Sequence, residues 1–327
     1  MHHTLKYSAC NGRFFVWVWL DAGMLRETAR FLSHFRDSLE CRVLPRVAGI
    51  LPWRYFFPLA RFLCSFPYLF QAEARASLAG AKAFGYVDSA FVWLSNHRFV
   101  RLVDQVDASI SAHCEDSWLD QHLVTDGEWP TAPFVGITFH FGAGLWAIRH
   151  LRRKAIRSSF LSAPLHPEIF PEHPLRYAFE VGRMAETERI SGKPIIYVGG
   201  SFKKLQAALA EGTSIIGLID VLAQFVPSTQ STKFLGHQSR FPNGLIDLAR
   251  HCEVPLAVFI CYPNVETGRR HLFIRQINRN DPDPLSTIIG TLENAISSAP
   301  WAWHLWPIAP DFFSSADDEK SPVGQIA

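Results

Sequence analysis

The chain has 327 residues, which leaves room for one large domain or two small ones with a sizeable core. Apolar residues make up 48% of it and charged residues only 19%, with 26 Phe and 10 Trp, so a membrane surface or a lipid-like substrate suits this composition. The formal net charge of +2, with no basic stripe, argues against nucleic acid as a partner.

The N-terminal part gives a mixed pattern. Residues 1–42 form an extension to which we assign no chemistry, with helical periodicity at residues 24–39. The apolar run at residues 14–20 is followed directly by Asp21 and lacks a small-residue cleavage site, so it indicates a strand or the start of a helix rather than a targeting signal.

Residues 43–130 are predicted to be mainly helical. The aromatic stretch at residues 48–70 contains Arg54, Arg61 and three prolines, so it cannot span a bilayer comfortably. Two interpretations remain open, a hairpin lying among lipid headgroups and a hairpin packed on the main domain. Helical spacing returns at residues 75–113, and the polar, proline-rich residues 115–133 mark the boundary to the next part.

Residues 131–313 are predicted to form an α/β domain, because short apolar runs alternate there with helical patterns. We expect a mostly parallel central sheet flanked by helices. The expected strands are residues 134–139, 158–161, 194–198, 214–219, 232–235, 256–260 and 271–274. The expected helices are residues 143–154, 175–191, 202–210, 244–251 and 285–298, and the polar tail 314–327 is expected to be disordered.

His140 is the first candidate for chemistry. It follows a buried apolar strand and precedes Gly142, Gly144 and a helical pattern, which places it at the carboxyl end of a strand, where open α/β sheets bind ligands. The positive end of the helix dipole is expected to keep the imidazole neutral and able to accept a proton, and the glycines allow backbone N–H groups to approach a developing oxyanion. A histidine that is simply packed at a strand end is the other interpretation.

Three other places could contribute. Gly199-Gly200-Ser201 opens a helix that carries Lys203 and Lys204, an arrangement that suits a phosphate or an ordinary capped helix. Asp220 ends a predicted strand on the same sheet edge as His140, where it either orients that ring or caps a loop.

The third place is the link between a predicted strand and a predicted helix at residues 236–244. Arg240 in this link could meet an anionic group, and a solvated loop is the alternative. Asn243 directly precedes the apolar periodic run and is expected to be its N-cap.

The order of four segments resembles the bacterial lysophospholipid acyltransferase-like superfamily, most nearly the late (lauroyl/myristoyl) acyltransferases of lipid A biosynthesis. The resemblance covers roughly residues 44–312. Its four segments are His140 after an apolar strand; Leu205, Gly212 and Ile219-Asp220; Phe234-Leu-Gly with Phe241-Pro-Asn-Gly244, which is similar to the family's acceptor-binding turn; and the aromatic run Pro-Trp-Ala-Trp-His-Leu-Trp at residues 300–306.

The resemblance implies an acyltransferase in which His140 is the base that activates an acceptor hydroxyl or amine. In that family an Asp or Glu stands five positions after the histidine, whereas position 145 here is Leu. Loss of an orienting carboxylate costs about 10⁴ in rate in serine proteases. Either Asp220, Glu186 or Glu188 substitutes, or the enzyme is slow, or catalysis has been lost.

Three functions follow as hypotheses. The first is an acyltransferase at the inner face of the membrane that uses the thioester of acyl carrier protein or coenzyme A as donor and a lipid or small-molecule acceptor. It needs no metal and no bound cofactor. The second is a non-catalytic protein of the same fold that binds acyl chains or lipids. The third is a thioesterase, which is disfavoured because the sequence lacks the G-x-S-x-G nucleophile elbow.

Six well separated cysteines without a C-x-x-C pair suggest reduced thiols in the cytoplasm.

Overall fold

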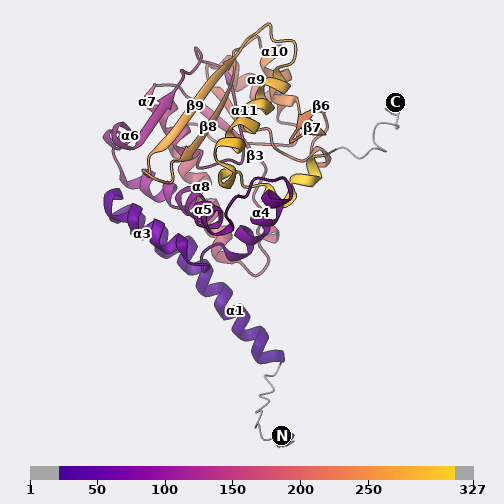
Figure 1. Ribbon diagram of the computed structural model, residues 1–327. Coiled ribbons are helices and arrows are strands. Elements are labelled where there is room, and N and C mark those ends of the chain that lie inside the picture. Colours follow the sequence, from indigo (N-terminus) through magenta and orange to yellow (C-terminus); the bar gives the residue numbers. More distant parts are fainter. Residues whose placement is uncertain (1–21, 314–327) are drawn as a thin grey trace, which may run out of the picture.

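The computed structural model describes residues 22–313, with side chains from residue 30 onward (Figure 1). The predictions for residues 14–20 and for the tail 314–327 lie outside these residues. The predicted architecture is confirmed: the chain is mixed α/β, and helices flank a seven-stranded sheet that is mostly parallel. No helix within residues 22–313 combines the length and the apolar character that crossing a membrane requires.

The sheet has the order β1-β9-β8-β2-β5-β3-β4. The strands β8, β2, β5, β3 and β4 run parallel to one another, β9 pairs antiparallel with β8, and β1 runs parallel to β9. Their bounds are β1 Leu123–Asp126, β2 Val135–Thr138, β3 Ser158–Ser162, β4 Ile196–Tyr197, β5 Ser214–Leu218, β8 Leu256–Pro263 and β9 Arg270–Ile277.

Two strands were not predicted. β1 lies within residues 115–133, so the sheet takes a strand from the segment that sequence reasoning treated as a boundary. β7 (His237–Pro242) pairs antiparallel with β6 (Thr229–Phe234) in a separate hairpin, so the prediction of a loop at residues 236–244 is wrong. The hairpin turn is Leu235-Gly236, both with positive φ, and it lacks the Asn-Gly or Asp-Gly pair that marks such turns.

Helices cover both faces of the sheet. α9, α10 and α11 pack on one face, and α5, α7 and α8 contact strands of the sheet on the other (Figure 1). The helix bounds are α1 Ala22–Ser38, α2 Leu44–Ile50, α3 Trp53–Ser65, α4 Gln71–Ala83, α5 Ala90–His113, α6 Ser117–His122, α7 Leu145–Arg153, α8 Pro174–Ser191, α9 Phe202–Ala210, α10 Gly244–His251 and α11 Pro284–Ser298. A π-helical turn, η1 (Leu39–Val43), joins α1 to α2, and short 3-10 turns lie at η2 Pro167–Ile169, η3 Ala223–Phe225, η4 Pro300–Ala302 and η5 Trp306–Phe312.

The strands divide the core into two layers, because successive side chains point to opposite faces. Val258 and Ile260 of β8 face the layer under α9, α10 and α11, whereas Ala257 and Phe259 face the layer that holds α3, α5 and α7. The central strands are therefore apolar on both faces, as a covered parallel sheet requires.

A buried ion pair joins the N-terminal helices to the sheet. Arg270 of β9 and Asp107 of α5 are in contact, and both side chains are 0% exposed. The guanidinium of Arg270 also lies 3.9 Å from the ring centroid of Trp53 in α3, and the rings of Trp118 and Trp146 are close by. One cation thus connects α3, α5 and β9 inside the core.

Breaking this pair on one side is expected to destabilise the fold. In Arg270→Met the Asp107 carboxylate stays buried without its partner, so urea unfolding should give a free energy of unfolding lower by about 3–5 kcal/mol. Arg279→Met is the matched control, because Arg279 pairs with Glu253 at the surface at 3.5 Å. A loss no larger than that of the control would contradict a supporting role for Arg270.

Candidate active site

The loop after β2 presents His140 at the carboxyl edge of the parallel sheet, where the sequence placed it. The buried strand ends at Thr138, and α7 begins at Leu145. Gly142 makes the turn between them with φ 70°, and a Cβ at this position would collide with the carbonyl oxygen of Cys261. Glycine is therefore required here, and the turn leaves the imidazole facing outward.

Asp220 contacts His140 from the neighbouring strand. β2 and β5 are adjacent and parallel, so residues that follow them meet at one edge. The Asp220 carboxylate accepts a hydrogen bond from His140 Nδ1 at 3.0 Å and from the His140 backbone N–H at 2.9 Å. The His140 side chain is 41% exposed and that of Asp220 is 0% exposed. The histidine is thus held by a buried acid, with Nε2 left outside that contact.

The C-terminal aromatic segment completes the site. The indole N–H of Trp303 donates to Asp220 at 3.2 Å, and the backbone N–H of His304 donates to the His140 carbonyl at 2.9 Å. His304 Nε2 also contacts the carbonyl oxygen of Gly142 at 2.9 Å. Neither residue was among the predicted site residues, although the segment itself was recognised as a motif.

The predicted neutrality of His140 is wrong in direction. Burial lowers the pKa of His140, but the charge and hydrogen bonds of Asp220 raise it by more, so this pKa lies above its usual value. The helix dipole on which the prediction relied is outweighed by a full charge at hydrogen-bond distance. A larger share of the rings is therefore protonated near neutral pH than in a free histidine.

A cavity of about 430 Å³ opens in front of His140, within the range typical of small-molecule sites. Gly144, Leu145, Ile148 and Phe160 belong to its walls. Its polar lining includes Arg101, Asp104, Glu180, Arg183 and His304, which come from α5, α8 and the C-terminal segment. The cavity thus combines an apolar wall with charged groups beside the imidazole.

The backbone N–H groups around Gly142, which were expected to approach an oxyanion, already have acceptors in the protein. The Gly142 N–H donates to Ala302 O at 2.8 Å, and the next N–H, of Ala143, donates to Cys261 O at 2.8 Å. Gly142 and Gly144 do line the cavity. Gly144 and Leu145, at the start of α7, also line the cavity, and in this turn the N–H of Ala147 donates to Gly144 O at 3.1 Å.

Ser201, Lys203 and Lys204 are not part of the cavity lining. Ser201 precedes α9 as predicted, but its side chain makes no capping hydrogen bond, because its backbone is already helical. Both lysines are exposed on the first turn of α9. The alternative of an ordinary helix start with solvated lysines matches this geometry.

Arg240 and Asn243 also lie outside the cavity lining. Arg240 is exposed on β7 and donates to the hydroxyl of Thr229 across the hairpin at 3.0 Å. Asn243 precedes α10 as predicted, but its amide donates to Asp247 at 2.8 Å rather than capping the helix. The turn proposed to bind the acceptor therefore does not face His140.

Glu186 and Glu188, the other proposed partners of His140, are engaged elsewhere. Glu186 accepts hydrogen bonds from Arg189 and from the Ser111 hydroxyl at 2.6 and 2.7 Å. Glu188 accepts the backbone N–H of Ile195 at 2.8 Å. Of the three candidates, Asp220 is the one in contact with the imidazole.

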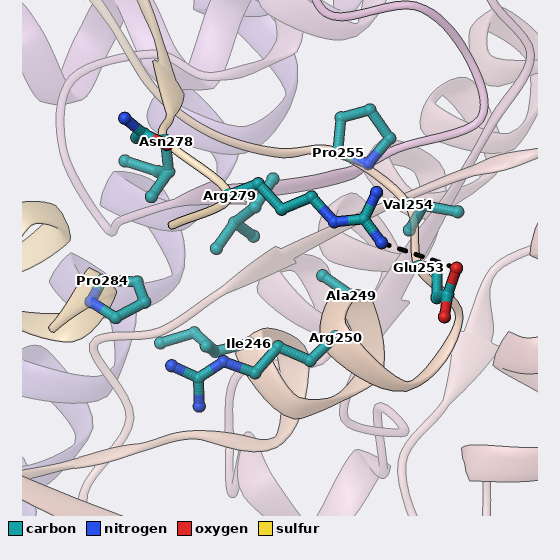
Figure 2. Close-up of a pocket in the computed structure, with 11 residues that line it drawn as sticks. Ile246, Ala249, Arg250, Glu253, Val254, Pro255, Asn278, Arg279 and Pro284 are labelled. Carbon is teal, nitrogen blue, oxygen red and sulfur yellow. Dashed lines mark ion pairs between the residues drawn. The ribbon is translucent and has the colours of Figure 1, made fainter. Parts of the chain in front are cut away.

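A second hollow of about 310 Å³ lies at the opposite end of the sheet (Figure 2). It is lined by Arg250, Glu253, Pro255 and Arg279 near the start of β8, which is aligned with the start of β2. Glu253 and Arg279 form a surface ion pair at 3.5 Å in this hollow. The His140–Asp220 pair lies at the other cavity, which is therefore taken as the candidate site.

Residues 22–313 contain no group of three or more His, Cys, Asp or Glu side chains placed to hold a metal ion. Comparison with known families gives no support for the resemblance noted above, because no family model matches the chain. No curated protein matches it either. The function is therefore argued from the geometry of the site.

The coupling of His140 to Asp220 predicts a pKa change that NMR can measure. In the wild type the imidazole should titrate above the ordinary value near 6.5. In Asp220→Asn the raising charge is lost while burial remains, so the His140 pKa should fall below that of the wild type. Resolved imidazole signals followed from pH 5 to 9 test this, and an unchanged His140 titration would contradict the coupling.

Proposed function

We propose that the protein is an acyltransferase that moves an acyl group from the thioester of acyl carrier protein or coenzyme A to a hydroxyl or amine. The observation that carries the proposal is the His140–Asp220 pair, with the buried acid on Nδ1 and a partly exposed ring at the mouth of a cavity. A base oriented by a carboxylate is the arrangement that activates a weak nucleophile.

The residues suggest a sequence of proton movements. Asp220 accepts the Nδ1–H of His140, which leaves the Nε2 lone pair to take the proton of the acceptor O–H or N–H. The acceptor oxygen or nitrogen attacks the thioester carbonyl carbon, and the C–S bond then breaks. The imidazolium returns its proton to the leaving sulfur, so the products are an ester or amide and a free thiol. Asp220 stabilises the imidazolium between the two transfers.

Removal of either member of the pair is expected to abolish most of the turnover. With lauroyl-coenzyme A as donor and a lipid extract as acceptor, thiol release should fall by about 10³–10⁴ in His140→Gln and in Asp220→Asn. His251→Gln is the matched control, because this exposed histidine lies at the end of α10, outside the cavity lining.

Three results would count against the proposal. Unchanged thiol release in His140→Gln would remove the imidazole from the mechanism. Free fatty acid formed at the same rate with and without acceptor would identify a thioesterase instead of a transferase. Binding of acyl chains without any thiol release would favour the non-catalytic alternative.

We further propose that the N-terminal helices rest on an anionic membrane surface. α1 and α3 lie at one end of the molecule, and α1 extends away from the rest (Figure 1). Over residues 30–69 the two acids, Asp37 and Glu40, are buried, whereas Arg42, Arg46 and Arg54 are exposed. The exposed large apolar side chains of this part are Phe31, Leu32, Phe35, Val43, Ile50, Tyr55, Leu59, Phe62, Phe66 and Tyr68. Exposed arginines and aromatic rings together suit the headgroup region of a bilayer.

Vesicle sedimentation tests this placement. The double variant Phe62→Ser/Phe66→Ser should bind vesicles with 30% anionic lipid at least tenfold more weakly than the wild type, because each buried Phe contributes roughly 1.5–3 kcal/mol. Phe225→Ser is the control, since Phe225 is 70% exposed in a different part of the chain. Equal binding by all three proteins, or equal binding to neutral vesicles, would contradict the proposal.

A further inference from the structure

One face of α5 supplies polar side chains to the His140 site. Trp93, His97, Arg101 and Asp104 are spaced by four, four and three residues, so they lie on the same side of the helix. Trp93 and His97 are buried and stacked, with ring centroids 5.0 Å apart. Arg101 and Asp104 follow them into the lining of the cavity. The helix thus carries a cation and an acid to the region in front of His140.

The two arginines of the cavity differ in their partners. Arg183 donates to both oxygens of Asp104 at 3.1 and 3.0 Å and to Glu180 at 3.5 Å. Arg101 forms no ion pair with any carboxylate in residues 30–313, and its buried Nε has no acceptor there. The two acids of the cavity lining, Asp104 and Glu180, are therefore both paired with Arg183. Arg101 has no carboxylate partner there, and its guanidinium lies 5.9 Å from the ring centroid of Phe70.

The histidines beside Arg101 do not compensate this charge. His97 Nδ1 contacts the Trp301 carbonyl at 2.8 Å, and His304 Nε2 contacts that of Gly142, so each ring serves as a donor to the backbone. Burial lowers the pKa of His97 to about 3, and burial together with the charge of Arg101 holds the pKa of His304 well below its usual value. Both rings are neutral near pH 7. A half-buried guanidinium among neutral rings is costly unless an anion meets it.

Part of the lining of the same cavity is apolar. Leu145, Ile148, Phe160 and Met184 line it, from α7, β3 and α8. A ligand that satisfies both parts has a hydrocarbon portion and one negatively charged group. This combination describes an anionic amphiphile better than a fully apolar or a fully polar molecule.

We propose that Arg101 binds the anionic head group, a phosphate or a carboxylate, of an amphiphilic acyl acceptor. The inference rests on the proposed acyl transfer and names the acceptor class. In an acyl carrier protein or coenzyme A thioester the whole pantetheine arm separates the sulfur from the nearest phosphate, so an anion held beside His140 belongs to the acceptor. Arg101 thus takes the role that the sequence assigned to Arg240, which faces away on β7.

Calorimetry with simple probes tests the assignment. Octyl phosphate, octanoate, 1-octanol and inorganic phosphate are titrated into the wild type, Arg101→Met, Arg101→Lys and the control Arg240→Met. The wild type should bind the better anionic amphiphile at least tenfold more tightly than octanol. Arg101→Met should lose this preference by tenfold to a hundredfold with octanol binding unchanged, whereas Arg101→Lys keeps part of it. Whichever of octyl phosphate and octanoate binds more tightly identifies the head group.

Three outcomes would overturn the inference. Octanol could bind as tightly as the anionic probes, Arg240→Met could lose as much affinity as Arg101→Met, or inorganic phosphate could bind as tightly as octyl phosphate, which would indicate a site for free phosphate. Thermal melting of each variant shows that it is folded. Because binding is measured without thioester, this result is independent of turnover: Arg101-dependent binding with no His140-dependent thiol release would refute the transferase and leave the anion subsite standing.

Discussion

The site depends on the hydrogen bonds that converge on the buried carboxylate of Asp220. A carboxylate with no exposed surface is stable only if donors replace the water it has lost. Its donors are the backbone and ring of His140 and the indole of Trp303, which are separated from it by 80 and 83 residues along the chain. The loop after β2, the end of β5 and the C-terminal aromatic segment must therefore form together, and none of the three can be rearranged without leaving this charge unpaired.

Strand order explains why these groups meet and why the sequence left the partner of His140 open. Local pattern indicates that His140 and Asp220 each follow a buried strand, and parallel strands bring such residues to one edge. It does not indicate which strands are neighbours. β2 lies between β5 and β8, so the acid after β5 reaches the histidine, whereas Glu186 and Glu188 belong to α8 and contact other groups. A pairing between residues 80 apart is decided by topology, which a single sequence does not contain.

The same distinction between local and long-range information applies to the fold. Helices α9 and α10 begin and end where the apolar periodicity predicted, because their amphipathic pattern is local. β7 was missed because its outer face is polar and its Leu-Gly turn lacks a typical hairpin pair. β1 was missed because a short, half-exposed strand in a polar segment is defined by its pairing with β9, not by its composition. The pKa of His140 was misjudged for a related reason, since the helix start is visible in the sequence and the distance to Asp220 is not.

Position 145 shows how these constraints fit together. An acid at this position would enter the His140 cavity from the first turn of α7, which is the wall where Leu145 now lies. Asp220 approaches the ring from the sheet, is 0% exposed and takes no part in the cavity lining. Because the carboxylate follows the neighbouring strand, the histidine is oriented while the start of α7 stays apolar, continuous with Ile148 one turn further along. Leu145 stands where the acyltransferase pattern has an acid, but the imidazole still has a carboxylate partner, so this leucine does not by itself argue against the proposed role of His140.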